Sequence, residues 1–210
     1  MSRDRLAPLH VRERHGVLEI LAGHVVLLSS AALETERAFG RLVSSLDRPP
    51  RRVLVGGLGF GATVRGVLDV APPDARVVVA EKVADVVSLV RGELAQVQDR
   101  PLDDPRVTVE TVDVRSAIDA AEGVYDAILL DVDNGPHWAA FRSNAGLYTP
   151  GGLAAARQAL TPGGALAVWS GYPADAFLAR LREAGFAPRR VLLEERGRVR
   201  ARAYVGVAPA

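Results

Sequence analysis

Two patterns of apolar and polar positions follow one another along the chain of 210 residues. Residues 1–30 alternate apolar and polar positions in short runs, separated by turn residues such as His15-Gly16 and Ala22-Gly23. Alternation of this kind predicts a small antiparallel β-meander. A helix is expected next, over Leu33 to Leu46, with Ser29 or Ser30 as its cap.

Asp47-Arg48-Pro49-Pro50 ends this first region, because proline disfavours helix in the residue before it. We place the boundary between two units there: residues 1–48, with the meander and helix, and residues 49–210. After it, uninterrupted apolar runs alternate with helical patterns, which predicts a mainly parallel sheet covered on both faces. The expected strands lie at 52–56, 77–80, 107–112, 125–130 and 165–169, with a closing hairpin at 191–193 and 203–207, and the expected helices at 64–68, 83–94, 118–121, 153–160 and 177–184.

The first of these strands runs directly into Gly56-Gly57-Leu58-Gly59-Phe60-Gly61-Ala62. Glycines in a turn between a strand and a helix let a nucleotide approach the backbone N–H groups. Gly57-x-Gly59-x-x-Ala62 fits the dinucleotide fingerprint, and Gly57-x-Gly59-x-Gly61 fits the version used for S-adenosylmethionine. The turn therefore predicts a nucleotide site without choosing the nucleotide.

Acidic residues follow the next three strands. Glu81 lies 20 residues after Gly61, the spacing at which a carboxylate accepts hydrogen bonds from ribose hydroxyls. Asp113 is placed to meet the amine of an adenine, and Asp131 lies where a second reactant would bind. Ligands of open α/β sheets bind outside the carboxyl ends of the strands, so these residues are expected to converge on one crevice. The alternative at Asp113 is that its side chain only stabilises the turn after the strand, as Asp commonly does at strand ends.

Composition narrows the class of protein further. A net charge of +1 gives no field that would favour nucleic acid or a membrane surface. The absence of cysteine excludes thiolate nucleophiles and cysteine metal sites, and no metal is expected. No apolar run approaches the length of about 18 residues needed for a membrane span, and Met1-Ser2-Arg3-Asp4-Arg5 lacks a signal core, so a cytoplasmic protein is expected. The basic residues are 25 Arg and one Lys, typical of a GC-rich bacterial genome.

The ordered motifs resemble those of the spermidine synthase (aminopropyltransferase) family, a branch of the class I S-adenosylmethionine-dependent methyltransferase fold. The resemblance spans residues 9–207 and rests on the motifs Val53–Gly61, Val79-Ala80-Glu81, Asp104-Pro105-Arg106-Val107, Val112-Asp113, 125–131 and 160–164. It implies a Rossmann-like domain with a seven-stranded sheet and a C-terminal antiparallel hairpin, preceded by a shortened N-terminal β-meander. It also implies a homodimer, with decarboxylated S-adenosylmethionine or S-adenosylmethionine as co-substrate. The implied nucleoside-binding residues are Gly56, Gly57, Gly59, Gly61, Glu81, Asp113 and Asp131.

Three positions depart from the family pattern. The glycine loop carries Leu58-Gly59-Phe60 where the family usually has an aspartate that meets the amine of the donor. The catalytic segment is shortened to Asp131-Val132-Asp133, so that Asp133 would supply the second acid. The region that usually holds a Tyr-His-Glu cluster reads Leu33-Glu34-Thr35-Glu36-Arg37-Ala38.

Asp131 and Asp133 are therefore the expected catalytic residues, with Asp131 binding a cationic amine and taking or relaying its proton. Asn134, His137 and Trp138 are expected to wall the substrate pocket, with Trp138 giving an apolar face. Trp169 is interpreted as a core residue. The alternating Arg196, Arg198, Arg200 and Arg202 are interpreted as one face of a solvated edge strand rather than a stripe that follows phosphates.

Three functions remain open at this point. The first is transfer of an aminopropyl group from decarboxylated S-adenosylmethionine to a small amine, as in polyamine biosynthesis. The second is methyl transfer from S-adenosylmethionine to an unknown acceptor, which the missing loop aspartate favours. The third is a nucleoside-binding protein without turnover, and binding of NAD is only weakly supported.

Overall fold

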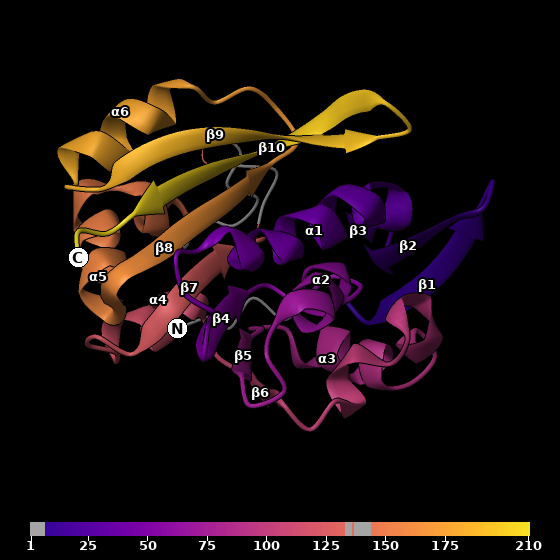
Figure 1. The fold of residues 1–210 in the computed structure, drawn as a ribbon. Coiled ribbons are helices and arrows are strands. Elements are labelled where there is room, and N and C mark those ends of the chain that lie inside the picture. Colours follow the sequence, from indigo (N-terminus) through magenta and orange to yellow (C-terminus); the bar gives the residue numbers. More distant parts are fainter. Residues whose placement is uncertain (1–6, 133–135, 137–143) are drawn as a thin grey trace, which may run out of the picture.

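The computed structural model describes residues 7–132, 136 and 144–210. Three strands, β1 (Leu9–Arg14), β2 (Val17–Ala22) and β3 (Val25–Ser29), form an antiparallel sheet in the order β1-β2-β3. This sheet stands at one side of the molecule, next to α3 (Ala84–Arg91) (Figure 1). The predicted N-terminal meander is confirmed.

The helix expected after the meander is present in three pieces. They are η1 (Ser30–Ala32), α1 (Leu33–Gly40) and η2 (Arg41–Ser45). Ser29 is the capping residue, and its Oγ accepts a hydrogen bond of 3.3 Å from the N–H of Ala31. The cap therefore belongs to the short η1 turn, and α1 begins without one.

The second sheet has seven strands in the order β6-β5-β4-β7-β8-β10-β9. All neighbouring pairs are parallel except those of β10, which runs antiparallel to β8 and β9. The predicted mainly parallel sheet with a C-terminal hairpin is confirmed. The strands are β4 (Arg52–Gly56), β5 (Arg76–Ala80), β6 (Val107–Glu110), β7 (Tyr125–Leu130), β8 (Leu160–Ser170), β9 (Ala187–Glu195) and β10 (Arg198–Val207).

Helices cover both faces of this sheet. One core layer joins α1, α2 (Ala62–Val70) and α3 to side chains such as Val55 and Leu129. The other joins α4 (Val114–Asp119), α5 (Pro150–Ala159) and α6 (Ala176–Glu183) to side chains such as Leu54 and Ile128. Alternate residues of the central strands thus face opposite layers, which explains why their sequences are apolar throughout. Short turns η3 (Ala95–Gln98), η4 (Pro101–Asp103) and η5 (Asn144–Tyr148) complete the described elements.

Several predicted boundaries were wrong. The helix expected to reach Leu94 ends at Arg91, where Gly92 leaves the helical conformation. The third strand ends at Glu110, and α4 begins at Val114 rather than at 118, because Asp113 caps the helix. β8 begins at Leu160 rather than at Ala165, so that Thr161–Gly164 belong to the strand.

Helices α1 and α2 touch through their backbones. A Cβ on Gly40 would collide with the carbonyl of Thr63, and a Cβ on Gly66 would collide with the carbonyl of Arg37. Glycine at both positions therefore allows the two helices to approach this closely. An exposed ion cluster lies beside the contact, in which Asp69 accepts hydrogen bonds from Arg37, Arg41 and Arg65.

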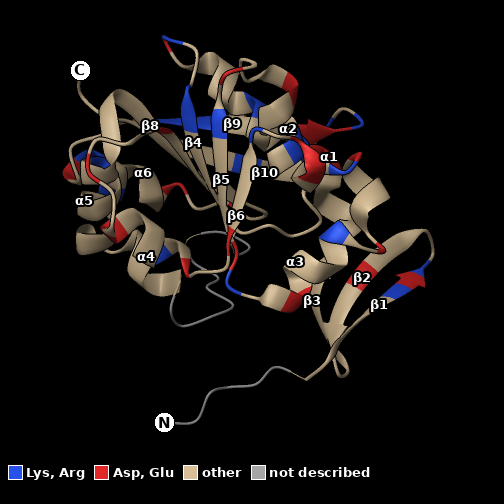
Figure 2. Cartoon of the chain, turned by 90° about the horizontal axis from the view of Figure 1, so that it is seen from below, with Lys and Arg blue, Asp and Glu red and all other residues tan. Residues whose placement is uncertain are grey.

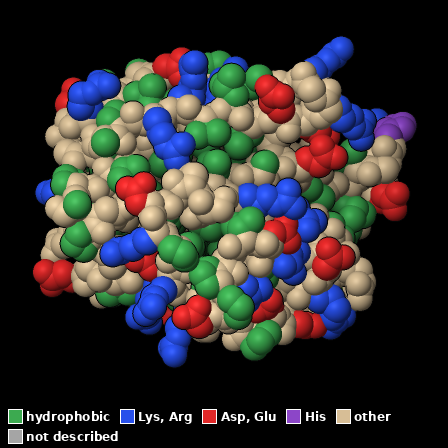
Figure 3. Space-filling model, viewed as in Figure 1, with side chains coloured by type: hydrophobic (Ala, Val, Ile, Leu, Met, Phe, Trp, Pro, Cys, Tyr) green, Lys and Arg blue, Asp and Glu red, His purple; other side chains and the backbone are tan. Residues whose placement is uncertain are grey.

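The charges of the surface are mixed in sign. Burial raises the pKa of Asp69, but the hydrogen bonds from three arginines outweigh burial and hold it well below its usual range. On the face shown in Figure 3, basic and acidic side chains are interspersed. On the N-terminal sheet, Arg12 and Glu19 form an ion pair of 2.6 Å, between strands that carry both signs of charge in Figure 2. Of the described helices, none is long and apolar enough to cross a membrane.

Candidate functional site

The glycine turn joins the end of β4 to the start of α2. Gly57, Gly59 and Gly61 all have positive φ, at 86°, 52° and 87°. At Gly57 a side chain is also excluded by contact, because its Cβ would collide with the carbonyl oxygen of Asp131. At Gly59 no atom of the described residues lies within 4 Å of such a Cβ, so this side of the turn is open toward them. The turn thus packs against the end of β7 on one side and leaves room on the other.

Glu81 follows β5 and bonds to the glycine turn. Its Oε2 accepts from the N–H of Leu58 at 3.0 Å, and its Oε1 accepts from the N–H of Val83 at 2.8 Å. Both bonds fix the carboxylate beside the turn. Each oxygen of a carboxylate has about two lone pairs, so each keeps one for the hydroxyl groups of a ligand.

Asp113 follows β6 and caps α4. Its Oδ1 accepts from the N–H of Arg115 at 2.9 Å, and its Oδ2 lies 4.0 Å from Nζ of Lys82. One carboxylate oxygen is therefore used by the fold, and the other faces a lysine from the end of β5. The cap explains Asp113 without any ligand, and its contact with an adenine stays a prediction.

Asp131 follows β7 and lies on the opposite side of the turn from Glu81. Its N–H donates to the carbonyl of Gly56 at 2.9 Å, which continues the pairing of β7 with β4. Its Oδ2 lies 2.5 Å from Oγ1 of Thr63, a buried residue in the first turn of α2. The same Thr63 hydroxyl lies 3.2 Å from the backbone carbonyl of Glu36 in α1. One hydroxyl thus connects the tip of β7 to both helices.

The carboxyl groups of Glu36 and Asp131 interact across this junction. Both residues keep some exposed surface as whole residues, whereas their carboxyl groups are enclosed by protein atoms. Burial raises the pKa of Asp131 to about 6, against the opposing effect of the Thr63 hydrogen bond. Burial, and then the charge of Asp131, raise the pKa of Glu36 well above its usual value. Paired acids of this kind bind cations and exchange protons near neutral pH.

Sequence reasoning missed two residues of this junction. Glu36 was noted only as part of a region without the family cluster, and Thr63, which directly follows the glycine stretch, was not singled out. Thr63 and Asp131 are 68 positions apart in the chain, and no local pattern joins them. The close helix pair allowed by Gly40 and Gly66 is what brings Glu36 to the end of β7.

The predicted site residues divide into three groups. Asp113 caps α4 and faces Lys82. The glycines, Glu81 and Asp131 surround the same turn, as the contacts above place them. Asp133, Asn134, His137 and Trp138 lie outside the described residues. Among the described residues, no group of three or more His, Asp or Glu could hold a metal ion.

The arginine row of the last hairpin was predicted wrongly. Arg196 lies in the turn between β9 and β10, with a φ of 51°, and is not part of a strand. A β-bulge between Val199 and Ala201 then shifts the register at Arg200. The four arginines therefore do not share one strand face. Trp169 is a core residue, as interpreted, because it is 7% exposed and packs with the α1–α2 layer.

Comparison with curated proteins finds aminopropyltransferases. The chain is 36% identical to polyamine aminopropyltransferase 2 of Pseudomonas aeruginosa over 123 residues, which cover 57% of this chain and 33% of that protein. It is 34% identical to a polyamine aminopropyltransferase of Nitrosomonas europaea over 119 residues, which cover 57% of this chain and 35% of that protein. The matched segments thus span about a third of these relatives, and no family model matches the chain.

Solved structures share the fold at low identity. A spermidine synthase in complex with the transition state analogue AdoDATO has a TM-score of 0.70 and 17% identity, over 90% of this chain and 64% of that one. The spermidine synthase from Thermotoga maritima has a TM-score of 0.70 and 17% identity, over 92% of this chain and 66% of that one. An O-methyltransferase family protein from Burkholderia thailandensis has a TM-score of 0.59 and 15% identity, over 86% of this chain and 58% of that one. The class I methyltransferase-like fold and the resemblance to spermidine synthases are confirmed.

Proposed function

We propose that the chain is a transferase that moves an aminopropyl group from decarboxylated S-adenosylmethionine to a small amine. The observation that carries the proposal is the pair of enclosed carboxyl groups, Asp131 and Glu36, beside the glycine turn. The matches to polyamine aminopropyltransferases support the same class of reaction. Two acids are more than the transfer of a methyl group to a neutral acceptor needs, and they suit an amine that arrives as a cation.

The donor would bind over the glycine turn. The open side of Gly59 leaves space for the nucleoside, and the free lone pairs of Glu81 would accept hydrogen bonds from its ribose hydroxyls. Asp113 would meet the adenine with the oxygen that is not used by the cap of α4. These contacts would orient the sulfonium toward the end of β7, where Asp131 lies.

The acceptor amine would bind at the acid pair. Asp131, ionised, takes a proton from the ammonium group, and the freed nitrogen lone pair attacks the carbon bonded to the sulfonium sulfur. A C–N bond forms, the C–S bond breaks with its electrons going to sulfur, and neutral methylthioadenosine leaves. Most of the rate would come from holding the nitrogen in line with this carbon, since effective molarities of well-oriented reactions reach about 10⁵ M or more.

Glu36 would serve as the second acid of the pair. The Thr63 hydroxyl lies next to both acidic residues, and α1 holds Glu36 at this place through its contact with α2. Asp133, the second acid expected from the sequence, stays a prediction.

Methyl transfer is the second candidate, and one observation favours it. The segment at the place of the family aspartate, Leu58-Gly59-Phe60, contains no acid, and its Leu58 is 4% exposed and packs in the α1–α2 core layer. The glycine turn therefore offers no acid of its own to the amine of a decarboxylated donor. A non-catalytic nucleoside-binding protein would share this turn and would show binding without turnover.

Product analysis separates these functions. The protein is incubated with decarboxylated or intact S-adenosylmethionine and a panel of amines that includes putrescine. Methylthioadenosine with an aminopropylated amine is the expected product, in the reactions that contain the decarboxylated donor. S-adenosylhomocysteine in the reactions with the intact donor would replace the proposal with methyl transfer. Nucleoside binding with no product would favour the non-catalytic protein.

We also propose that the protein acts as a cytoplasmic homodimer, as the family resemblance implies. Light scattering after gel filtration is expected to give twice the chain mass of 22.3 kDa. A mass of one chain at micromolar concentration would contradict the dimer.

A further inference from the structure

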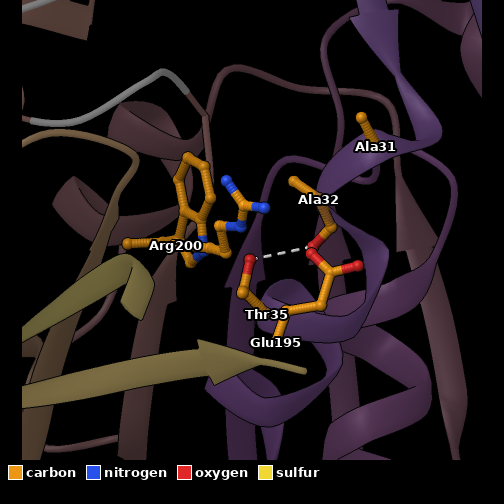
Figure 4. Close-up of a pocket in the computed structure, with 6 residues that line it drawn as sticks. Ala31, Ala32, Thr35, Glu195 and Arg200 are labelled. Atoms are coloured by element: carbon orange, nitrogen blue, oxygen red, sulfur yellow. Dashed lines mark hydrogen bonds between the residues drawn. The ribbon is translucent and has the colours of Figure 1, made fainter. Parts of the chain in front are cut away.

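A cavity of about 400 Å³ lies between the start of α1 and the last hairpin. Figure 4 shows the side chains of Glu195 and Arg200 reaching from the hairpin toward Ala32 and Thr35. We refer to it as the hairpin cavity, and it is lined by Ala31, Ala32, Thr35, Trp169, Glu195 and Arg200.

Two of its lining residues are neighbours of the acid pair, one across paired strands and one along the chain. β7 and β8 are paired in parallel with Leu130 opposite Val168, so Asp131 and Trp169 follow at neighbouring strand ends. Neighbouring strands lie about 4.8 Å apart. Thr35 in turn precedes Glu36 in α1. A chain of a few carbon atoms is long enough to span this separation between neighbouring strands.

The lining contains a hydrogen-bond donor to which no described residue offers an acceptor. Nε1 of Trp169 is buried and has no hydrogen-bond partner among the described residues. A buried N–H without an acceptor is unfavourable, and an oxygen of a ligand that accepts from it would remove this cost. The Arg200 side chain is exposed, so it can turn and admit a ligand to the indole. Trp169 and Arg200 together offer N–H donors to an anion.

The same lining also contains acceptors. Glu195 is half-buried and carries a negative charge, and the hydroxyl of Thr35, which donates to the Ala32 carbonyl at 2.9 Å, keeps its lone pairs. Neither Glu195 nor Arg200 forms an ion pair with any residue that the structure describes. One cation, one anion, an indole N–H and a hydroxyl oxygen make up a neutral site. Its complement is a group that carries an ammonium and a carboxylate together.

We propose that the hairpin cavity binds the α-amino carboxylate of an acceptor whose side-chain amine reaches Asp131, so that the acceptor is a basic α-amino acid. The proposal rests on the proposed function and names its acceptor class. The carboxylate binds Arg200 and the Trp169 N–H, and the α-ammonium binds Glu195 and the Thr35 hydroxyl. The side-chain amine loses its proton to Asp131 and takes the aminopropyl carbon, with methylthioadenosine as the leaving group.

Intact S-adenosylmethionine carries the same zwitterionic group on its methionine part. The order of the strands assigns the cavity to the acceptor instead. The residues proposed to bind the nucleoside follow β4, β5 and β6, whereas the cavity lies beyond β7, at β8, β9 and β10. The donor and the acceptor of an in-line displacement approach the transferred carbon from opposite sides, which agrees with this division.

Pairs of compounds that differ by one carboxylate test the proposal. Lysine is compared with 1,5-diaminopentane, ornithine with putrescine, and intact with decarboxylated S-adenosylmethionine. Each acceptor is measured both as a substrate and by the thermal shift it adds to the protein already saturated with methylthioadenosine. We expect the amino acids to give kcat/KM at least about tenfold above their decarboxylated partners, and to give the larger shift.

Variants of the hairpin provide matched controls. Arg200→Ala is expected to lower kcat/KM for lysine or ornithine by about tenfold and to leave the diamines unchanged, as loss of one charged hydrogen bond implies. Arg198→Ala and Glu194→Gln, at exposed positions of the same hairpin outside the cavity lining, are expected to change neither. Trp169→Phe keeps an aromatic ring, removes the N–H and should act in the same direction as Arg200→Ala.

The outcomes separate this proposal from the proposed function. Transfer to diamines without binding of amino acids overturns the cavity assignment and leaves the function standing. Binding of amino acids that depends on Arg200, with no transfer to any amine, supports the cavity and overturns the function. If Arg200→Ala instead removes a preference for the intact donor, the cavity belongs to the donor and our assignment is wrong.

Discussion

The carboxyl groups on the two sides of the glycine turn differ in their hydrogen-bond partners and in their burial. On the side of β5 and β6, Glu81 and Asp113 accept hydrogen bonds from backbone N–H groups of their own chain, at 2.8–3.0 Å. On the side of β7, the carboxylate of Asp131 has one hydrogen bond among the described residues, from the hydroxyl of Thr63. Its acidic neighbour is Glu36. Hydrogen bonds from the backbone hold the carboxylates of the first side in place. On the second side, burial favours the protonated form of the carboxyl groups.

This difference suggests a division of labour. Carboxylates fixed by backbone N–H groups keep one position and suit the recognition of a rigid nucleoside. Carboxyl groups whose pKa is raised toward neutral pH suit the uptake and release of protons. Changes on the β7 side should therefore affect turnover, and changes on the β5 side should affect binding.

The largest effect is expected from Asp131→Asn. Asparagine keeps the size of the side chain and can accept the Thr63 hydrogen bond, but it cannot take a proton from the amine. We expect kcat to fall by about 10³, in the range found when a general base is removed. The thermal shift given by methylthioadenosine should stay unchanged, and the exposed Asp119→Asn should behave as the parent protein. A fall of less than tenfold in kcat would mean that Asp131 is not the base.

The contact between α1 and α2 should be the next most sensitive feature. A methyl group at Gly66 would collide with the Arg37 carbonyl, so Gly66→Ala must push α1 away from α2. We expect a loss of about 3 kcal/mol in the free energy of unfolding, as for other overpacked sites, and a lower kcat because Glu36 moves with α1. Urea denaturation and the transfer assay measure the two effects.

Gly151 provides the control for this substitution. It lies in α5, its φ is not positive, and no atom of the described residues lies within 4 Å of the place that an added methyl group would take. Gly151→Ala is therefore expected to stabilise the protein by about 0.5–1 kcal/mol through the lower entropy of the unfolded chain. If Gly66→Ala were equally stabilising, the helices would not be in the backbone contact described above.

Glu81→Gln should produce a smaller effect, on binding alone. The amide can still accept the N–H of Leu58 or Val83 with its oxygen, but its nitrogen replaces one acceptor with a donor. We expect the dissociation constant of methylthioadenosine to rise about tenfold, equivalent to about 1.4 kcal/mol, with kcat changed less than twofold. Isothermal titration of this variant beside the exposed Glu122→Gln measures the constant. A large loss of kcat with unchanged affinity would contradict the assignment of binding to the β5 side and of turnover to the β7 side.

Most residues on the β5 and β6 side of the glycine turn could be predicted from the sequence, and few of those on the β7 side. Glu81 and Asp113 directly follow apolar strands, so the position of each is fixed by a pattern of a few residues around it. Asp131 was found by the same rule. Glu36 and Thr63 lie in helices whose own patterns predict only which face is buried, and their meeting depends on the approach of two backbones at Gly40 and Gly66.

The fold was predicted well for a related reason, and the errors lie where local chemistry overrides a pattern. The order and direction of the strands follow from runs of apolar residues separated by helices, which tolerate errors of several residues at each end. Asp113 moved the start of α4 by capping it, and Gly92 stopped α3 before its apolar pattern ended. The bulge at Arg200 broke a regular alternation that the sequence alone presents as intact.

Thr63→Val gives the smallest effect and the most direct test of the pair. The hydroxyl of Thr63 stabilises the ionised form of Asp131, so its removal should raise the pKa of Asp131 above about 6. A hydrogen bond to a charged group contributes about 1.5 kcal/mol, which corresponds to about 1 pH unit. Because the ionised form is the base, kcat/KM rises with pH through this pKa, and the acidic limb of the profile should move upward by that amount. Thr108→Val, at an exposed position of β6, should leave the limb in place. An acidic limb that stays in place in Thr63→Val as well would show that the group that titrates in the rate is not the one bonded to Thr63.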